Sequence, residues 1–342
     1  MRKPVQHLLA VAAVAAGLWS GGVAAQELVV GIFGGSFLDD SKTCHIAEFE
    51  KKTGAKVATK TGSSSQFAAA IRATAGKSDM DVVYIDNSLA VQLKNEKLLD
   101  AIDRSKIPSA ADVSAKMFDK DNQYVVFMTG ATVIVYDPTQ IKTPPTSWND
   151  LFKPEYAGRM AIGDISGTSG LHLLLALNRM NGGDLSNLEP GFKAIKPLAK
   201  NSVTLYTQAD QIVSLFERKE VVIAAWYPDR AGSVIDKGLP MAVVYPKEGA
   251  VGILPALVIP KGAKNPALAL RYIEEVLSAR GQGCFAEKKY AGPVNTKVTL
   301  SEKARKIVPF GESFEQLWAP DPEAVAKNVG EWTRRWQREV TR

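Results

Sequence analysis

The sequence has little of what many metalloproteins and enzymes require. Its 342 residues include only three histidines, His7, His45 and His172, which disfavours a histidine-rich metal site. The phosphate-loop motif GxxxxGK[ST], the zinc-protease motif HExxH and the hydrolase motif GxSxG are all missing. The body of the chain also lacks an apolar run of the roughly 20 residues that a membrane-spanning helix needs. With 46% hydrophobic and 23% charged residues, the composition is that of an ordinary globular protein.

The first 25 residues predict a secretory signal peptide that is cleaved after Ala25. Arg2 and Lys3 form a positive start, and an apolar stretch over Leu8–Trp19 follows, which is short for a membrane span. Small residues at 23–25 match the requirement of a signal peptidase. The alternative is an N-terminal membrane anchor. Cleavage predicts an exported, periplasmic protein that begins at Gln26.

The net charge becomes less informative once this segment is removed. Loss of Arg2 and Lys3 leaves 40 basic and 36 acidic residues, so the formal charge falls from +6 to +4. The remaining chain of 317 residues contains no basic block of the kind that binds nucleic acid. We therefore expect no nucleic-acid partner.

The chain has two cysteines, Cys44 and Cys284. An oxidising compartment permits a disulfide between them, and two buried thiols are the alternative, because spacing alone does not establish proximity. No CxxC motif is present, which disfavours zinc and thioredoxin chemistry. We expect no metal and no cofactor.

Strand-like and helix-like segments alternate along the chain, which predicts an α/β fold with parallel sheets covered by helices. Strands are expected at Glu27–Phe33, 56–60 and 81–85, each followed by a polar loop and a helix. Ligands bind where such loops gather, at the carboxyl ends of the strands. The first candidate ligand-binding residues lie in these three loops: Gly35, Ser36, Ser64, Ser65, Asp86 and Asn87.

Two further groups of candidates lie in the second half of the chain. Ser166, Thr168 and Ser169 precede an apolar helix, where hydroxyls and free N–H groups suit an anionic ligand; simple helix capping is the alternative. Trp226 and Tyr227 offer aromatic faces, and Asp229 could bind an ammonium group. A strand-end aromatic buried in the core is the alternative for this second group.

Three segments resemble bacterial extracellular solute-binding proteins. The turn at residues 34–37 with the later Phe49–Val57 (FEKKTGAKV) looks like the start of that family, and Asp81–Asp103 resembles its next segment. Val221–Leu277 is similar to the spermidine/putrescine-binding branch, and the similarity continues into KKYAGPVNTKV (288–298). Together the likeness spans essentially the whole exported chain.

This resemblance implies a monomeric type II periplasmic binding protein. Each of its two lobes would be a mainly parallel sheet flanked by helices, with the ligand cleft between the lobes. The expected division places residues 26–136 and 257–312 in lobe 1, and residues 137–256 and 313–342 in lobe 2. The partners implied are a small-molecule ligand and the permease of an inner-membrane ABC importer. The resemblance also places the helices carrying Cys44 and Cys284 in one lobe, which favours the disulfide.

The substrate of the resembling branch does not transfer directly. Polyamine binders have a tryptophan and an aspartate in the strand that aligns with GILPALVIP, where this chain has Ile253 and Pro255. An amine left without a carboxylate in a closed cleft would be costly. We therefore expect a solute other than a plain polyamine: an amino acid-like or gamma-aminobutyrate-like molecule, or another small carboxylate or phosphonate.

Two alternatives stay open at this stage. A ferric iron-binding protein of the same fold would use paired adjacent tyrosines, whereas Tyr227 follows a tryptophan. A secreted serine hydrolase would use Ser169 or Ser36 as nucleophile with His172 as base, since His172 follows Ser169 by three positions on the expected helix. We expect a binding protein and no enzymatic activity.

Overall fold

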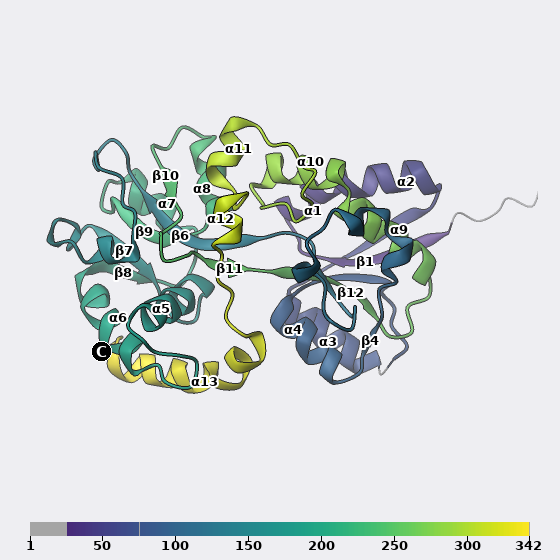
Figure 1. The fold of residues 1–342 in the computed structure, drawn as a ribbon, viewed down its shortest axis with the longest axis horizontal. Coiled ribbons are helices and arrows are strands. Elements are labelled where there is room, and N and C mark those ends of the chain that lie inside the picture. Colours follow the sequence, from purple (N-terminus) through teal and green to yellow (C-terminus); the bar gives the residue numbers. More distant parts are fainter. Residues whose placement is uncertain (1–25, 75, 342) are drawn as a thin grey trace, which may run out of the picture.

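The computed structural model describes residues 26–74 and 76–341 and has two lobes, each built on a six-stranded sheet (Figure 1). The expected signal peptide and its cleavage after Ala25 lie outside the described residues. Among the helices that the structure describes, none is long and apolar enough to cross a membrane.

The sheet of the first lobe has the strand order β2-β1-β3-β12-β4, and β5 also pairs with β12. Its strands are β1 Glu27–Ile32, β2 Lys56–Thr61, β3 Val82–Asp86, β4 Leu99–Asp100, β5 Val125–Val126 and β12 Pro255–Pro260. β1 runs parallel to β2 and β3, whereas β12 is antiparallel to its neighbours. The first four residues of β3 are all buried, as expected for a central strand covered on both faces.

Helices on both sides cover this sheet. They are α1 Ser36–Ser41, the π-helix η1 Lys42–Ile46, α2 Ala47–Thr53, α3 Ser64–Thr74, α4 Asn87–Asn95, α9 Pro266–Leu277 and α10 Ala279–Lys289, with short 3₁₀ turns η2 Arg104–Lys106, η3 Pro108–Ala111 and η4 Ala115–Met117. α2 ends at Gly54, whose φ of 71° is the left-handed conformation that favours glycine. Phe67 and Ile71 lie buried on the inner face of α3, which agrees with their spacing of one helical turn.

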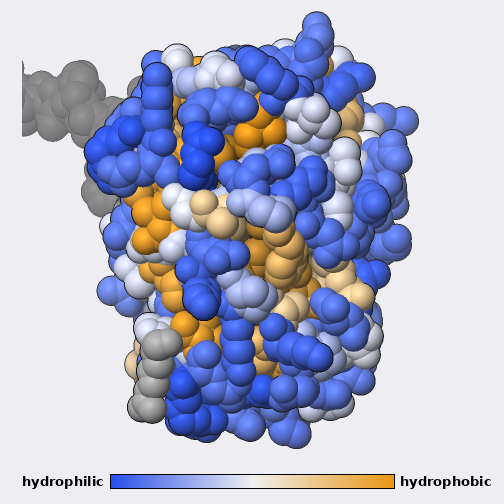
Figure 2. Space-filling model, turned by 90° about the vertical axis from the view of Figure 1, so that its left-hand side faces the viewer, coloured by the Kyte–Doolittle hydropathy of each residue, from blue (hydrophilic) through white to orange (hydrophobic). Residues whose placement is uncertain are grey.

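The sheet of the second lobe has the order β10-β6-β9-β7-β8, and β11 pairs with β6. Its strands are β6 Gly130–Tyr136, β7 Met160–Gly163, β8 Ser202–Tyr206, β9 Ile223–Trp226, β10 Ala242–Val244 and β11 Val251–Ile253. The surrounding helices are η5 Trp148–Phe152, η6 Pro154–Tyr156, α5 Thr168–Met180, α6 Glu189–Asn201, α7 Gln211–Glu217, α8 Pro228–Ile235, α11 Glu302–Ile307, α12 Glu312–Glu315 and α13 Pro322–Glu339. Hydrophilic side chains cover most of the face that this lobe presents in Figure 2, with apolar residues between them.

The two-lobed fold is confirmed, but both sheets are mixed instead of mainly parallel. The strands that lead into each lobe from the other, β6 and β12, run antiparallel to their neighbours. The crossing points also differ from the expected division. β6 pairs with β9, β10 and β11, so residues 130–136 belong to the second sheet. This crossing is difficult to predict from the sequence, because the apolar strands β5 and β6 follow each other closely although they belong to different sheets.

The C-terminal third adds further connections between the lobes. α11 packs against α8 of the second lobe, and the Tyr245 hydroxyl donates to the carbonyl of Ile307 at 2.7 Å, although 257–312 was expected in the first lobe. α13 buries Trp332 and Trp336 in the core of the second lobe, as its apolar stripe predicts. Its first turn reaches α4 of the first lobe, where Asn95 donates to Glu323 at 3.0 Å.

Candidate functional site

The larger candidate site is a cavity of about 720 Å³ between the lobes. Ser36 at the start of α1 and Lys289 in the last turn of α10 form its first-lobe side. The second-lobe side comes from α7, the end of β9, α8 and the loop that follows α8. Of the predicted binding residues, Ser36, Trp226 and Asp229 line this cavity together.

A smaller cavity of about 180 Å³ lies beside the segment that leads from β11 into β12 and so from the second lobe to the first. Asp86 and Asn87 enter it from the start of α4, and Thr168 enters it from the start of α5 in the other lobe. The remaining wall includes Ile253 and His172. Six of the twelve predicted binding residues are therefore divided between two cavities, both of which are lined by residues of the two lobes.

Lys289 is the functional candidate that the sequence patterns did not single out. Its ammonium group donates a hydrogen bond to the Ser36 hydroxyl at 3.0 Å, and its side chain is half-buried. A cation in the last turn of a helix is favoured by the helix dipole. The signal available in the sequence was the basic pair Lys288-Lys289 at the end of an expected helix, which a solvated surface explains equally well.

Asp229 provides the opposite charge in the same cavity. It lies in the first turn of α8, and burial raises the pKa of its carboxyl, while the positive charges of Lys289 and Arg230 lower it by less. Arg230 itself pairs with Asp210 at 2.6 Å. Asp229 and Asp210 both line the cavity, and of these two carboxylates only Asp210 forms an ion pair within 4.0 Å among the described residues.

Asp86 is a second carboxylate at the boundary between the lobes. It is the N-cap residue of α4, but its side chain makes no capping hydrogen bond. Its backbone N–H donates to the Ser64 hydroxyl at 3.0 Å, so the predicted Ser64 acts here as a support for the β3–α4 junction. Burial raises the pKa of Asp86 although part of its side chain is open to solvent, a combination expected for a carboxyl in a cleft.

Trp226 lines the larger cavity and Ser169 is buried behind the cavity walls, and the polar atoms of both side chains are already paired. The hydroxyl of the fully buried Ser169 bonds to Tyr206 at 2.6 Å, and its backbone N–H donates to the Tyr227 hydroxyl at 2.9 Å. The Trp226 indole donates to the carbonyl of Ala209 at 3.0 Å. Gly163 is required beside them, because a Cβ there would lie 2.3 Å from the Ser169 hydroxyl.

The other predicted residues remain on the surface. The side chains of Ser65, Ser166 and Thr168 are exposed, and so is Gly35, whose φ is 64°. Gly35 and Ser65 follow β1 and β2 at the edge that faces the second lobe, as the strand–loop–helix pattern predicts. These positions leave the loops accessible to a solute that enters between the lobes.

Comparison with known proteins gives the family. The model of bacterial extracellular solute-binding proteins matches residues 45–308. The chain belongs to this family. A spermidine/putrescine-binding periplasmic protein of Escherichia coli K12 is 27% identical over 358 aligned positions, with 97% of this chain and 94% of that protein covered. A gamma-aminobutyric acid-binding protein of Pseudomonas aeruginosa is 21% identical, with coverages of 91% and 92%.

A solved structure supports the same placement. The crystal structure of an ABC transporter protein from Clostridium perfringens superposes with a TM-score of 0.80 at 27% identity, and covers 92% of this chain and 99% of that one. The predicted resemblance and the two-lobed fold are therefore confirmed for this solute-binding protein.

The hydrogen bonds of this solute-binding protein do not form the dyad of the hydrolase alternative. The His172 ring bonds through Nδ1 to the Thr132 hydroxyl at 3.0 Å, whereas the Ser169 hydroxyl bonds to Tyr206. Burial lowers the pKa of His172 to about 4. Within residues 26–74 and 76–341, no three histidine, cysteine, aspartate or glutamate side chains gather into a group that could hold a metal ion.

The chemistry that this arrangement supports is recognition of a charged solute. A cation from one lobe and a carboxylate from the other line one cavity, and a second carboxylate lies at the neighbouring cavity. Such groups bind a polar solute most strongly when the lobes enclose it, since charge-assisted hydrogen bonds gain strength where water is excluded.

Proposed function

We propose that this protein is the periplasmic solute-binding component of an ABC importer and that its solute is a small zwitterion of the gamma-aminobutyrate type. The observation that carries the solute class is the presence of Lys289 and Asp229 in one interlobe cavity. Lys289 would bind the carboxylate of the solute, and Asp229 would bind its ammonium group. Closure of the lobes would exclude water from both contacts.

Export, the permease partner and a monomeric state belong to the same proposal. Membership of a family of extracellular binding proteins supports export, as does the periplasmic location of the Escherichia coli relative, and the likeness to an ABC transporter structure supports the permease partner. Expression of the full chain followed by osmotic shock would release a monomer shortened at its N-terminus to Gln26. Retention in the membrane fraction would favour the anchor instead.

The Ile253 and Pro255 positions support a solute other than a plain polyamine. The side chain of Ile253 lines the smaller cavity as an apolar group, and Pro255 lies opposite Asp86 in the register of β12 and β3. One observation favours a diamine as a second candidate: Asp86 and Asp229 each place a carboxyl in a cavity that both lobes line. Two such carboxylates would suit an amine at each end of a solute.

Calorimetry on the exported chain would test the proposal with four probes: gamma-aminobutyrate, butylamine, butyrate and putrescine. Gamma-aminobutyrate should bind most tightly, because it alone satisfies both charges. Lys289→Gln should weaken gamma-aminobutyrate at least tenfold and leave butylamine unchanged, whereas Asp229→Asn should weaken both. Lys288→Gln, an exposed neighbour of Lys289, is the control. Tighter binding of putrescine would replace the first candidate with the second, and a preference for ferric iron in a parallel titration would remove both.

A further inference from the structure

A disulfide joins the two first-lobe segments that reach the cavity: α1 with the π-helix η1 that continues it, and α10. Cys44 in η1 and Cys284 in α10 are bonded, with their Cα atoms 5.5 Å apart and 240 positions apart in the sequence. Cys44 is fully buried beside Phe285, and the rings of Phe285 and Phe37 make an edge contact at 5.1 Å. Covalent and aromatic contacts therefore hold the α1–η1 segment against α10.

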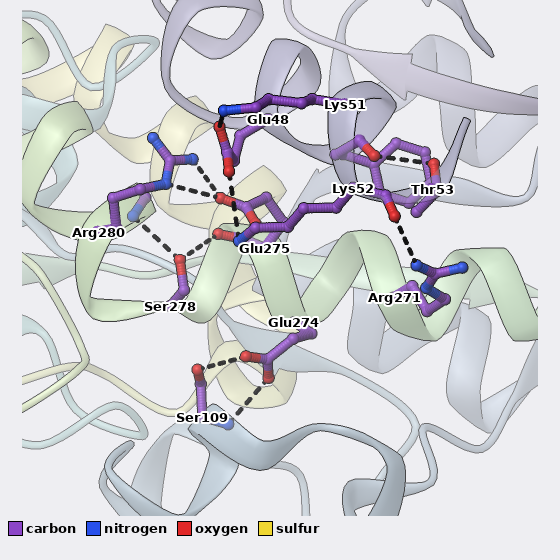
Figure 3. Close-up of polar contacts among 12 residues, drawn as sticks. Glu48, Lys51, Lys52, Thr53, Ser109, Arg271, Glu274, Glu275, Ser278 and Arg280 are labelled. Carbon is purple, nitrogen blue, oxygen red and sulfur yellow. Dashed lines mark hydrogen bonds and ion pairs between the residues drawn. The ribbon is translucent and has the colours of Figure 1, made fainter. Parts of the chain in front are cut away.

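A buried carboxylate reinforces the same junction (Figure 3). Glu275 at the end of α9 is 3% exposed and accepts hydrogen bonds from Lys52 of α2 at 2.8 Å and from Arg280 Nε of α10 at 3.1 Å. Arg280 also donates to the carbonyl of Cys44 at 2.6 Å, next to the disulfide. Glu275 thus connects α2, α9 and α10 through one buried carboxylate that accepts from both Lys52 and Arg280.

The continuous α1–η1 segment and α10 each bring one residue to the cavity. Ser36 starts α1, and Lys289 lies in the last turn of α10, where its ammonium group reaches the Ser36 hydroxyl at 3.0 Å. A mobile lysine side chain loses rotamer entropy when it binds, so a lysine that is already oriented binds an anion more tightly than a mobile one. The position of α10 relative to α1 decides whether Lys289 can make this contact.

We infer that Cys44, Cys284 and Glu275 are positioning residues of the solute site, which hold Lys289 at Ser36 so that it meets the anionic end of the solute. This role goes beyond stabilising the lobe, because the same links determine where a binding cation lies. The inference rests on the proposed function for the identity of the anionic group, but the placement of Lys289 can be measured without any solute.

The solute-free test uses acylation of lysines by an N-hydroxysuccinimide ester, followed by peptide mass spectrometry. The rate at Lys289, divided by the rate at Lys288, should rise at least about threefold in Glu275→Gln and in the double variant Cys44→Ser/Cys284→Ser, since a lysine that loses its partner is more accessible. Glu274→Gln is the matched control. Glu274 lies on the same helix, but its carboxylate accepts hydrogen bonds from the backbone N–H of Ser109 at 2.9 Å and from the Ser109 hydroxyl at 2.7 Å (Figure 3). The ratio of the Lys289 rate to the Lys288 rate should stay unchanged in this variant. An unchanged ratio in Glu275→Gln would overturn the inference.

The second test is a mutant cycle with gamma-aminobutyrate as the probe. Glu275→Gln should weaken its binding about fivefold, with butylamine affected less than twofold, because butylamine has no anionic end. In the Lys289→Gln background, Glu275→Gln should cost no further affinity. An additive loss there would mean that Glu275 acts only on stability and would overturn the inference. A Lys289→Gln variant with normal affinity would instead contradict the proposed function, and the acylation rates would still decide the positioning role.

Discussion

The backbone N–H of Ser169 donates a hydrogen bond to the hydroxyl oxygen of Tyr227 at 2.9 Å, so the N-cap residue of α8 satisfies a free donor in the first turn of α5. Two helices that border the interlobe site are tied together at their N-termini by this contact. From the sequence we expected the free N–H groups at the start of α5 to bind an anionic ligand. In the folded protein the N–H group of Ser169 already donates to Tyr227.

Tyr227→Phe removes this acceptor and should lower the free energy of unfolding by about 1 kcal/mol, the usual net value of one hydrogen bond. Urea denaturation with an unchanged m-value would measure it. Tyr206→Phe is the comparison, because that hydroxyl bonds to both Ser169 and the carbonyl of Ala225 in a buried position. Tyr206→Phe should lower the free energy of unfolding by more than Tyr227→Phe does. Equal midpoints for wild type and Tyr227→Phe would contradict the structural role given to this hydroxyl.

Acidification should destabilise the protein through its two buried histidines. Burial lowers the pKa of His45 to about 3 and that of His172 to about 4, below the value of about 6.5 in an unfolded chain. Between those values the unfolded state binds protons that the folded state excludes, so stability is complete above pH 7 and is lost as the pH falls. The expected loss from pH 7.5 to pH 5 is roughly 2 kcal/mol for each histidine.

Denaturant titrations at the two pH values would measure this loss, and His172→Asn should reduce the difference by about half. His45→Asn should do the same independently, since the two rings lie in different lobes. A pH dependence that is unaltered in both variants would mean that other groups cause it.

Gly232 sets the distance between α8 and the residue that follows α10. A Cβ at position 232 would lie 2.2 Å from a ring carbon of Tyr290, whose hydroxyl donates to Asp236 at 2.9 Å. Gly232→Ala should therefore displace Tyr290, break its contact with α8 and cost about 1–3 kcal/mol. Small-angle scattering should show a larger radius of gyration as the lobes separate. Gly330→Ala in α13, where space is open, is the control and should be neutral or stabilising.

Local patterns predicted the elements of the fold better than the uses of their residues. The sequence pattern agrees with the structure at the buried Phe67 and Ile71 of α3, at Gly54 where α2 ends, and along the apolar stripe of α13. These features depend on short-range rules of periodicity and capping. The disulfide between Cys44 and Cys284 required the family resemblance, because no local signal connects residues so distant in the chain.

The site was harder to predict because its residues compete for partners across the fold. Ser169 and Trp226 have the chemistry of ligand contacts, yet Tyr206, Tyr227 and the Ala209 carbonyl take their polar atoms. Lys289 has the chemistry of a surface lysine, yet the packing of α10 against α1 brings it into the cavity. Both outcomes depend on tertiary contacts that the order of residues does not reveal.

Two buried tryptophans of the second lobe differ in whether their indole nitrogen is hydrogen-bonded, and this difference should appear in their contributions to stability. Trp336 of α13 and Trp148 of η5 are both fully buried in the core of the second lobe. The Trp148 indole donates to the carbonyl of Gly249 at 3.2 Å, whereas the Trp336 indole nitrogen has no hydrogen-bond partner among the described residues. Replacement by phenylalanine removes similar volume at the two sites, but only Trp148→Phe leaves a buried carbonyl without its donor. Trp148→Phe should therefore cost about 1 kcal/mol more than Trp336→Phe in urea denaturation, because an unsatisfied buried group adds to the cavity term. A Trp336→Phe variant that is the less stable of the two would contradict the stabilising role given to the hydrogen bond of Trp148.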